Sequence, residues 1–205
     1  MLYFHWQKLA FLEVPKTGSS AVRKVLAPLA TIDINGPPRA RHQNGPIFER
    51  ITRSWLEQIT THKVETFAVM RDPVDRIRSW YRFLGRQEKY RQQIDNMRFE
   101  DFVDSVLAGE DLTRAVGRQD IFFMGDGDSP LIQHIFRYDQ PEHLHAFLGD
   151  RFDRPFDFPR VNVSPNVKGA EVTPSIRRKL QQARPREMAL WEALCKNGWL
   201  DNTPG

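Results

Sequence analysis

Residues 9–20 read LAFLEVPKTGSS, and this stretch decides how the rest of the chain is interpreted. The apolar run at residues 9–14, closed by Pro15, predicts a buried strand of a parallel sheet. From Ser20 onward the period changes, because apolar residues recur at helical spacing at Val22, Val25, Leu26 and Leu29. The sequence therefore predicts a strand, a short loop and a helix, in that order.

A second unit of the same kind follows at residues 66–84. Residues 66–70, TFAVM, are strand-like, Asp72 is a good N-cap, and Pro73 suits the first helical position. The predicted buried face of the helix that follows consists of Val74, Ile77, Tyr81 and Leu84. Two such units predict an α/β, three-layer, P-loop-like fold with a central parallel sheet flanked by helices. In such folds ligands bind beyond the carboxyl ends of the strands.

Helical patterns also recur along the rest of the chain. They are predicted at residues 48–59, 99–107, 142–148 and 174–195, the last of them interrupted near Pro185. No repeat and no linker divides the chain, so we expect one domain spanning residues 1–205.

The composition is that of a globular protein, with 40% hydrophobic residues, fourteen Phe and five Trp. A formal net charge of +4 favours anionic partners, although an ordinary solvated surface explains so small an excess equally well. The single cysteine, Cys195, cannot form an internal disulfide. No apolar stretch approaches the roughly 18 residues of a membrane-spanning helix. We therefore expect a cytoplasmic protein without a membrane span.

The first loop, residues 15–20, has the features of a phosphate cradle. Gly18 lets the backbone approach an oxyanion, the helix N-terminus offers unpaired N–H groups, and Lys16 supplies a full charge. Hydroxyl donors come from Thr17, Ser19 and Ser20. The alternative is an ordinary strand-to-helix turn with a serine cap. Because Lys16 precedes Gly18, the loop is not a Walker A sequence, and no second glycine supports a dinucleotide fingerprint.

The second loop places Arg71 at the end of a predicted strand and Ser79 two turns into the following helix. Both side chains could therefore meet one phosphate group. Arginine suits that contact because its planar guanidinium can donate two hydrogen bonds to a phosphate. The alternative is that Arg71 only forms an ion pair with Asp72 or Asp75.

Together, residues 15–20 and 71–81 resemble the two nucleotide motifs of sulfotransferases that use 3′-phosphoadenosine 5′-phosphosulfate (PAPS), in particular the carbohydrate-type branch. The first resembles the family's 5′-phosphosulfate loop, and the second resembles its 3′-phosphate motif. Weaker similarities occur at Gln119-Asp120 and at residues 136–139 and 160–164. The chain departs from that branch in having Ser19 where a second glycine is common. It also lacks the branch's membrane anchor and disulfides, so a bacterial-style cytoplasmic form matches better.

The resemblance implies PAPS as the donor and adenosine 3′,5′-bisphosphate as its product. The expected reaction is in-line, metal-independent transfer of a sulfuryl group to an acceptor hydroxyl, or less readily an amine, of a glycan or small molecule. Lys16 would stabilise the leaving phosphate as a catalytic residue. The same lysine would bind the 5′ end of the donor with Thr17, Gly18, Ser19 and Ser20, while Arg71 and Ser79 would bind its 3′-phosphate.

His42 is the predicted general base. An imidazole with a pKa of about 6.5 accepts a proton at neutral pH, and Arg41-His42 matches a basic-histidine pair that related enzymes often carry between the two motifs. Glu13, beside the first loop, is the competing base, and a surface position is the alternative for His42. The other histidines considered lie in helix-like segments and are expected to be structural or solvated: His134, His143 and His145.

Two other function classes remain open at this stage. A nucleotide or small-molecule kinase would share the strand-loop-helix cradle, but it should carry a Walker A lysine and a carboxylate for Mg²⁺. A basic nucleic-acid-binding module would explain the charge, but it should show clustered Lys and Arg with aromatic stacking positions. We expect neither a bound metal nor a nucleic-acid partner. The sequence identifies neither the acceptor nor the oligomeric state.

Overall fold

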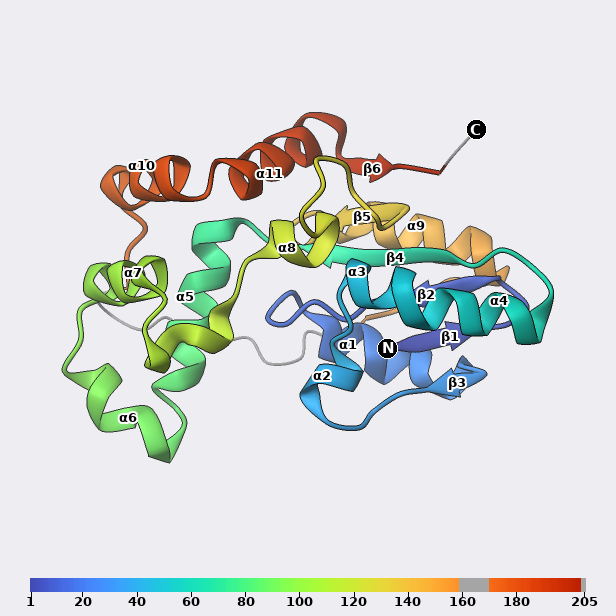
Figure 1. The fold of residues 1–205 in the computed structure, drawn as a ribbon, viewed down its shortest axis with the longest axis horizontal. Coiled ribbons are helices and arrows are strands. Elements are labelled where there is room, and N and C mark those ends of the chain that lie inside the picture. Colours follow the sequence, from blue (N-terminus) through green and yellow to red (C-terminus); the bar gives the residue numbers. More distant parts are fainter. Residues whose placement is uncertain (159–169, 204–205) are drawn as a thin grey trace.

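The computed structural model describes residues 1–158 and 170–203, and it contains a six-stranded sheet, which lies in the right-hand part of Figure 1. The strands are β1 (Leu2–Phe4), β2 (Leu9–Phe11), β3 (Ile32–Asp33), β4 (Glu65–Met70), β5 (His134–Arg137) and β6 (Trp199–Asp201). Their order across the sheet is β3-β1-β2-β4-β5-β6. β2, β4 and β5 run parallel, whereas β1, β3 and β6 pair antiparallel with their neighbours. The sheet is therefore mixed, and the predicted parallel arrangement holds only for its core strands.

Helices form much of the remaining described chain. In chain order they are α1 (Ser19–Leu26), the 3₁₀ segment η1 (Ala27–Leu29), α2 (Pro38–Arg41), α3 (Gly45–Ile47), the π-helical segment η2 (Phe48–Arg53), α4 (Ser54–Thr60), α5 (Pro73–Leu84), α6 (Glu88–Asp95), α7 (Phe99–Ala108), the 3₁₀ segment η3 (Asp111–Val116), α8 (Gln119–Met124), α9 (Pro141–Phe152), α10 (Pro174–Ala183) and α11 (Pro185–Asn197). The four further helical patterns seen in the sequence are confirmed as η2 with α4, α7, α9, and the pair α10 and α11.

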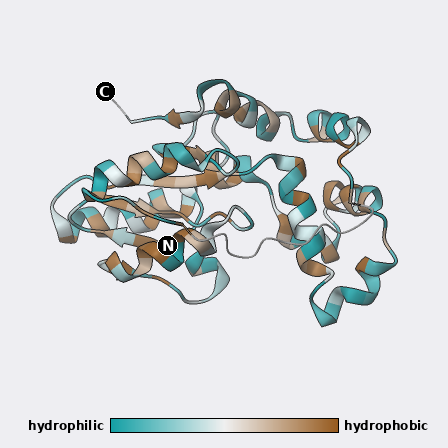
Figure 2. Cartoon of the chain, turned by 180° about the vertical axis from the view of Figure 1, so that it is seen from behind, coloured by the Kyte–Doolittle hydropathy of each residue, from teal (hydrophilic) through white to brown (hydrophobic). Residues whose placement is uncertain are grey.

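The helices cover both faces of the sheet, which confirms the three-layer fold. On one face α1 and α9 pack against Phe67 and Val69 of β4. On the other face η2, α4, α8 and α11 pack against Ala68 and Met70 of the same strand. Neighbouring residues of β4 serve opposite faces because the side-chain period of a strand is two. Figure 2 shows the hydrophobic strands lying between helices whose outer sides are hydrophilic.

A second group of helices, α5, α6, α7 and α10, packs beside the sheet around a core of its own, and we call it the helical lobe (Figure 1). Helix α5 enters it directly from β4. Its predicted buried face is confirmed at Val74, Ile77 and Leu84. Trp80 completes that face in place of Tyr81, which is half-buried and donates its hydroxyl to the Met97 carbonyl oxygen at 2.7 Å.

Some boundaries and positions differ from the sequence prediction. β2 ends at Phe11, and residues 12–14 continue into the first loop. His134 lies on β5 and not on a helix, because HIFR is a short buried strand in the sheet. His143 and His145 lie on α9 as expected. The weak similarity at residues 160–164 lies outside the described residues. Among the described helices, none combines the length and apolar character needed to cross a membrane.

Candidate functional site

The first loop connects β2 to α1 with two residues in the left-handed backbone region, Lys16 at φ +70° and Gly18 at φ +78°. That conformation is uncommon for a lysine. It is held by arginines of the second unit, since Arg71 Nη1 donates to the Lys16 carbonyl oxygen and Arg76 Nε to the Pro15 carbonyl oxygen, both at 3.2 Å. The two nucleotide-like motifs are therefore in direct contact.

These two carbonyl contacts also orient the N–H groups of the loop. In a trans peptide the N–H points opposite to the C=O, so the N–H groups of Lys16 and Thr17 face away from the arginines. Within the described residues, no hydrogen bond uses the backbone N–H of Lys16, Thr17 or Gly18. The N–H groups of Ser19 and Ser20 at the start of α1 follow at once and have no acceptor among the described residues, whereas the next N–H group, of Ala21, donates to the Gly18 carbonyl oxygen. Successive unpaired N–H groups of this kind form a site for an anion.

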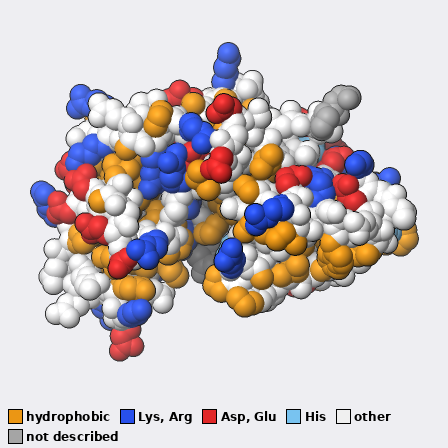
Figure 3. Space-filling model, in the orientation of Figure 1, with side chains coloured by type: hydrophobic (Ala, Val, Ile, Leu, Met, Phe, Trp, Pro, Cys, Tyr) orange, Lys and Arg blue, Asp and Glu red, His pale blue; other side chains and the backbone are white. Residues whose placement is uncertain are grey.

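A cavity of about 310 Å³ opens beside this loop. Its lining residues are Pro15, Lys16, Gly18, Ser19, Ser20, Arg41, His42, Arg71, Ser79, Trp80, Phe83 and Tyr138. Three of these side chains are cationic, namely Lys16, Arg41 and Arg71, and none is a carboxylate, so the cavity suits an anionic ligand. Figure 3 shows Lys and Arg side chains on both sides of the hollow between the sheet and the helical lobe.

The predicted site residues come together in this cavity with one exception. Thr17 is buried, and its hydroxyl donates to the Val14 carbonyl oxygen at 3.0 Å. Its side chain therefore stabilises the loop from behind and does not reach the cavity. Its backbone N–H makes no hydrogen bond to another described residue.

The ammonium group of Lys16 lies against the aromatic side chains of α5. Its Nζ is 3.9 Å from the ring centroid of Phe83 and 5.6 Å from that of Trp80. Burial, with the nearby positive charges of Arg86 and Arg71, lowers the pKa of Lys16 to about 8. The lysine is therefore still mostly cationic at neutral pH, and a negatively charged ligand would stabilise that charge.

Arg71 is positioned by contacts on three sides. Its Nε donates to Asp75 Oδ2 at 2.5 Å, so the ion pair that the sequence left open is present. Its guanidinium carbon lies 4.3 Å from the ring centroid of Tyr138. Asp72 instead caps α5 by accepting from the Asp75 N–H, and it pairs with Arg177. The ion pair with Asp75 does not remove Arg71 from the cavity, which it lines together with Ser79.

Tyr138 lines the cavity but was not among the predicted site residues, although residues 136–139 showed a weak similarity to the family. It follows β5 directly, at the carboxyl end of a parallel strand, which is the signal that could have found it. Its ring lies so close to Gly18 that a Cβ atom there would be 2.9 Å from Tyr138 Cε2. Glycine is therefore favoured at position 18, because a side chain there would be strained by the positive φ and would also displace the Tyr138 ring.

His42 follows α2 and lines the cavity. Its Nδ1 lies 2.7 Å from the backbone carbonyl oxygen of Glu13. A carbonyl can only accept, so Nδ1 carries the hydrogen and the lone pair of the neutral ring is on Nε2. Burial lowers the pKa of His42, although its hydrogen bond to the Glu13 carbonyl acts in the opposite direction. The ring is therefore neutral at pH 7 and able to accept a proton.

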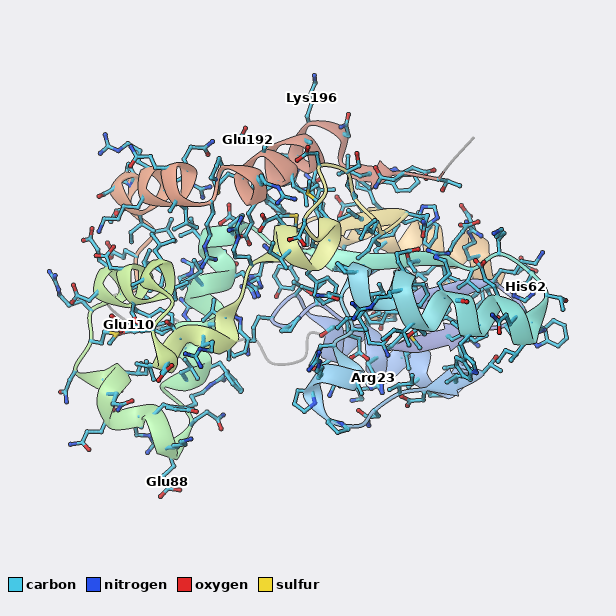
Figure 4. All side chains as sticks on the ribbon, in the orientation of Figure 1. Arg23, His62, Glu88, Glu110, Glu192 and Lys196 are labelled. Carbon is cyan, nitrogen blue, oxygen red and sulfur yellow. The ribbon has the colours of Figure 1, made fainter. Side chains whose placement is uncertain are left out.

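The competing base, Glu13, is fully buried and has both carboxylate oxygens occupied. Oε1 pairs with the Met1 ammonium at 2.9 Å and with Arg23 Nη1 at 2.6 Å, and Oε2 pairs with Arg41 Nε at 3.0 Å. Figure 4 labels Arg23 on α1. Glu13 does not line the cavity. Its side chain fixes Arg41 and its carbonyl fixes His42, so the geometry favours His42 as the base.

Comparison with known proteins agrees with these features. The family model described as "Sulfotransferase family" matches residues 1–143. Searches of the curated proteins and of the solved structures returned no significant match. The matched span contains both loops and the whole cavity lining, from Pro15 to Tyr138.

Proposed function

The chain belongs to the sulfotransferase family, whose enzymes take the sulfuryl group from PAPS, and we propose that it transfers this group to a hydroxyl of a carbohydrate or glycan-like acceptor. The observation that carries the proposal is the single cavity that both motifs and His42 line. Because the chain belongs to this family, the two other hypotheses drawn from the sequence, a kinase and a nucleic-acid-binding module, are set aside.

Binding of the donor would use two neighbouring parts of the cavity lining, the first loop and the start of the second unit. We assign the 5′-phosphosulfate to Lys16 and the unpaired N–H groups of the first loop, because the cavity beside this loop has no carboxylate in its lining and no described protein group accepts from those N–H groups. We assign the 3′-phosphate to Arg71 and Ser79, which the second unit brings to the same cavity. The fit rests on charge, since the donor is a polyanion and the lining is cationic.

Catalysis would then depend on positioning and charge stabilisation. PAPS supplies an activated sulfuryl group on a phosphate leaving group. His42 Nε2 accepts the acceptor's hydroxyl proton as the new bond from oxygen to sulfur forms and the bond from sulfur to the phosphate oxygen breaks. Lys16 and the loop N–H groups stabilise the negative charge that develops on the leaving phosphate. His42 afterwards returns its proton to solvent.

The acceptor class is proposed from the resemblance to carbohydrate-type enzymes and from Arg41. This arginine precedes His42 in the chain and lines the cavity with it, while its Nε is held by Glu13. A guanidinium beside the base favours a hydroxyl that carries a neighbouring anionic or strongly polar group. A sugar hydroxyl on a charged glycan meets that requirement.

The assignment of the 3′-phosphate predicts strong discrimination between nucleotides. Adenosine 3′,5′-bisphosphate should bind on the order of a hundredfold more tightly than ADP, because two contacts at about 1.5 kcal/mol each are lost without the 3′-phosphate. Arg71→Ala should remove most of this difference. Isothermal titration calorimetry of both nucleotides with both proteins measures the two ratios.

The two ratios distinguish a failure of the role assigned to Arg71 from a failure of the donor placement. Equal ratios of dissociation constants in wild type and Arg71→Ala would show that Arg71 is only structural. A wild-type ratio near one would contradict the placement of the donor in this cavity. Thermal melts of Arg71→Ala serve as the folding control, because Arg71 also bonds to Lys16 and Asp75.

The two shifted pKa values predict a bell-shaped pH profile of kcat/KM. The base His42 must be neutral, and its pKa lies below the ordinary value, so activity should be lost only as pH falls below about 6.5. Lys16 must be protonated, so activity should fall as pH rises through about 8. Initial rates from pH 5 to pH 10 test this expectation. A profile that stays flat from pH 7 to 9.5 would contradict the role of Lys16.

A further inference from the structure

The side chain of Gln119 is fully buried behind the cavity, at the start of α8. Its Oε1 accepts from the backbone N–H of Arg71 at 3.1 Å, and its Nε2 donates to the backbone carbonyl of Arg71 at 2.9 Å. One amide therefore satisfies both main-chain groups of Arg71. The strand ladder cannot do this, because the pairing of β4 with β5 ends at Met70.

Gln119 is itself held in one orientation by Glu187 of α11. Oε1 of Glu187 accepts from the Gln119 backbone N–H at 3.0 Å and from its Nε2 at 3.2 Å. Both amide hydrogens of Gln119 thus have acceptors, which fixes the amide against a flip. Arg184 Nη1 in turn lies 3.4 Å from Oε2 of Glu187, and both of these side chains are buried.

The same buried layer also reaches the first loop. Arg76, which bonds to the Pro15 carbonyl, directs its remaining nitrogens at the carbonyls of Val116 and Gly117. Arg184 Nη1 donates to the Gly117 carbonyl as well, at 3.2 Å. The segment that carries Gln119 is therefore fixed to α5 and to α11. A buried network with its hydrogen bonds made is rigid, and its loss leaves costly unpaired groups.

We propose that Gln119 is a positioning residue for the donor. Its two hydrogen bonds to the Arg71 backbone direct the Arg71 guanidinium toward the 3′-phosphate, and Glu187 keeps the Gln119 amide in the orientation that makes these bonds. The proposal rests on the proposed function, because it acts through the 3′-phosphate contact of Arg71. It assigns a role to α11, which lies beyond the matched residues 1–143. Rigid support of this kind matters because small displacements of a binding group strongly weaken the contact.

The test uses the ratio of dissociation constants for ADP and adenosine 3′,5′-bisphosphate. Gln119→Met keeps the length of the side chain and removes its hydrogen bonds, and it should lower the ratio about tenfold. The matched control is Gln133→Met, at the other end of β4. There Gln133 Oε1 accepts from the Thr66 N–H at 2.9 Å, so the control removes a hydrogen bond from a glutamine side chain to the β4 backbone far from Arg71. It should destabilise the fold but leave the ratio unchanged.

A double-mutant cycle completes the test. In the Arg71→Ala background, Gln119→Met should change the ratio no further, because Gln119 acts through Arg71. An unchanged ratio in Gln119→Met, an equal fall in Gln133→Met, or an additive effect in the double variant would each overturn the proposal. If Gln119→Met does not fold, Gln119→Asn replaces it, because asparagine keeps an amide but is one methylene too short to reach the Arg71 backbone. A wild-type ratio near one would instead overturn the 3′-phosphate site itself, and the positioning role with it.

Discussion

Replacing His42 with alanine is expected to lower kcat by about 10²–10⁴-fold, the usual contribution of a general base. The Nδ1 hydrogen of His42 is held by the Glu13 carbonyl, which leaves Nε2 as the proton acceptor in the cavity. Donor binding should change little, because the imidazole is neutral and is not among the groups assigned to the nucleotide. Single-turnover rates and calorimetric donor affinities measure the two quantities separately.

A histidine elsewhere provides the control for this experiment. His145 on α9 stacks on Phe158 at a centroid distance of 4.8 Å, and His145→Ala should leave kcat unchanged. The acidic limb of the pH profile should also disappear in His42→Ala, since its titration causes that limb. Loss of donor affinity with an unchanged chemical step would show that His42 binds the donor and is not the base.

Replacing Lys16 with alanine is expected to reduce turnover by two to three decades, as does loss of one preorganised oxyanion donor. The lysine brings the full positive charge of the first loop to the cavity, where no carboxylate in the lining competes for it. Stability should change little, because alanine has no easier access than lysine to the left-handed backbone of this position. Steady-state kinetics and thermal melts of the same preparation test both expectations.

The exposed Lys24, on the same helix that follows the loop, is the matched control. Lys24→Ala removes one positive charge from the protein without touching the cavity, and it should retain full turnover. Near-normal turnover in a folded Lys16→Ala variant would contradict the assignment of the first loop to the leaving phosphate. A similar loss in Lys24→Ala would mean that net charge alone controls the rate.

The sequence predicted the fold where hydrophobic periodicity was long enough to read. The two strand-loop-helix units were found because the period changes from strand-like to helical within a few residues. β1, β3 and β6 have only two or three residues each, which is too short for a period to show. β5 was also missed, since four apolar and basic residues do not distinguish a strand from a helix. Because these strands were missed, the antiparallel edges of the sheet were not predicted.

The site was predictable where local sequence carries the chemistry. Lys16 and Gly18 lie in the loop between β2 and α1, and Arg71 directly follows β4, so the pattern there indicates an anion site before any contact is known. Gln119 had been noticed only through a weak similarity, because its role comes from a backbone 48 positions away in the chain. Nor could the sequence show that the Thr17 hydroxyl donates to the Val14 carbonyl oxygen and so does not reach the cavity.

At Lys16 the left-handed backbone conformation is unfavourable for a residue with a side chain, yet the position carries the lysine whose charge lies in the cavity. A residue with a side chain in this region lies about 1–2 kcal/mol above the right-handed alternative, whereas glycine would have no such penalty. A lysine there means that some folding stability has been exchanged for a charge in the cavity, a common trade-off at functional sites. Within the described residues no protein group accepts from the N–H groups of Lys16, Thr17 and Gly18, so a bound anion would supply acceptors that the protein does not. Binding of the proposed donor should therefore stabilise this turn and raise the melting temperature of the protein.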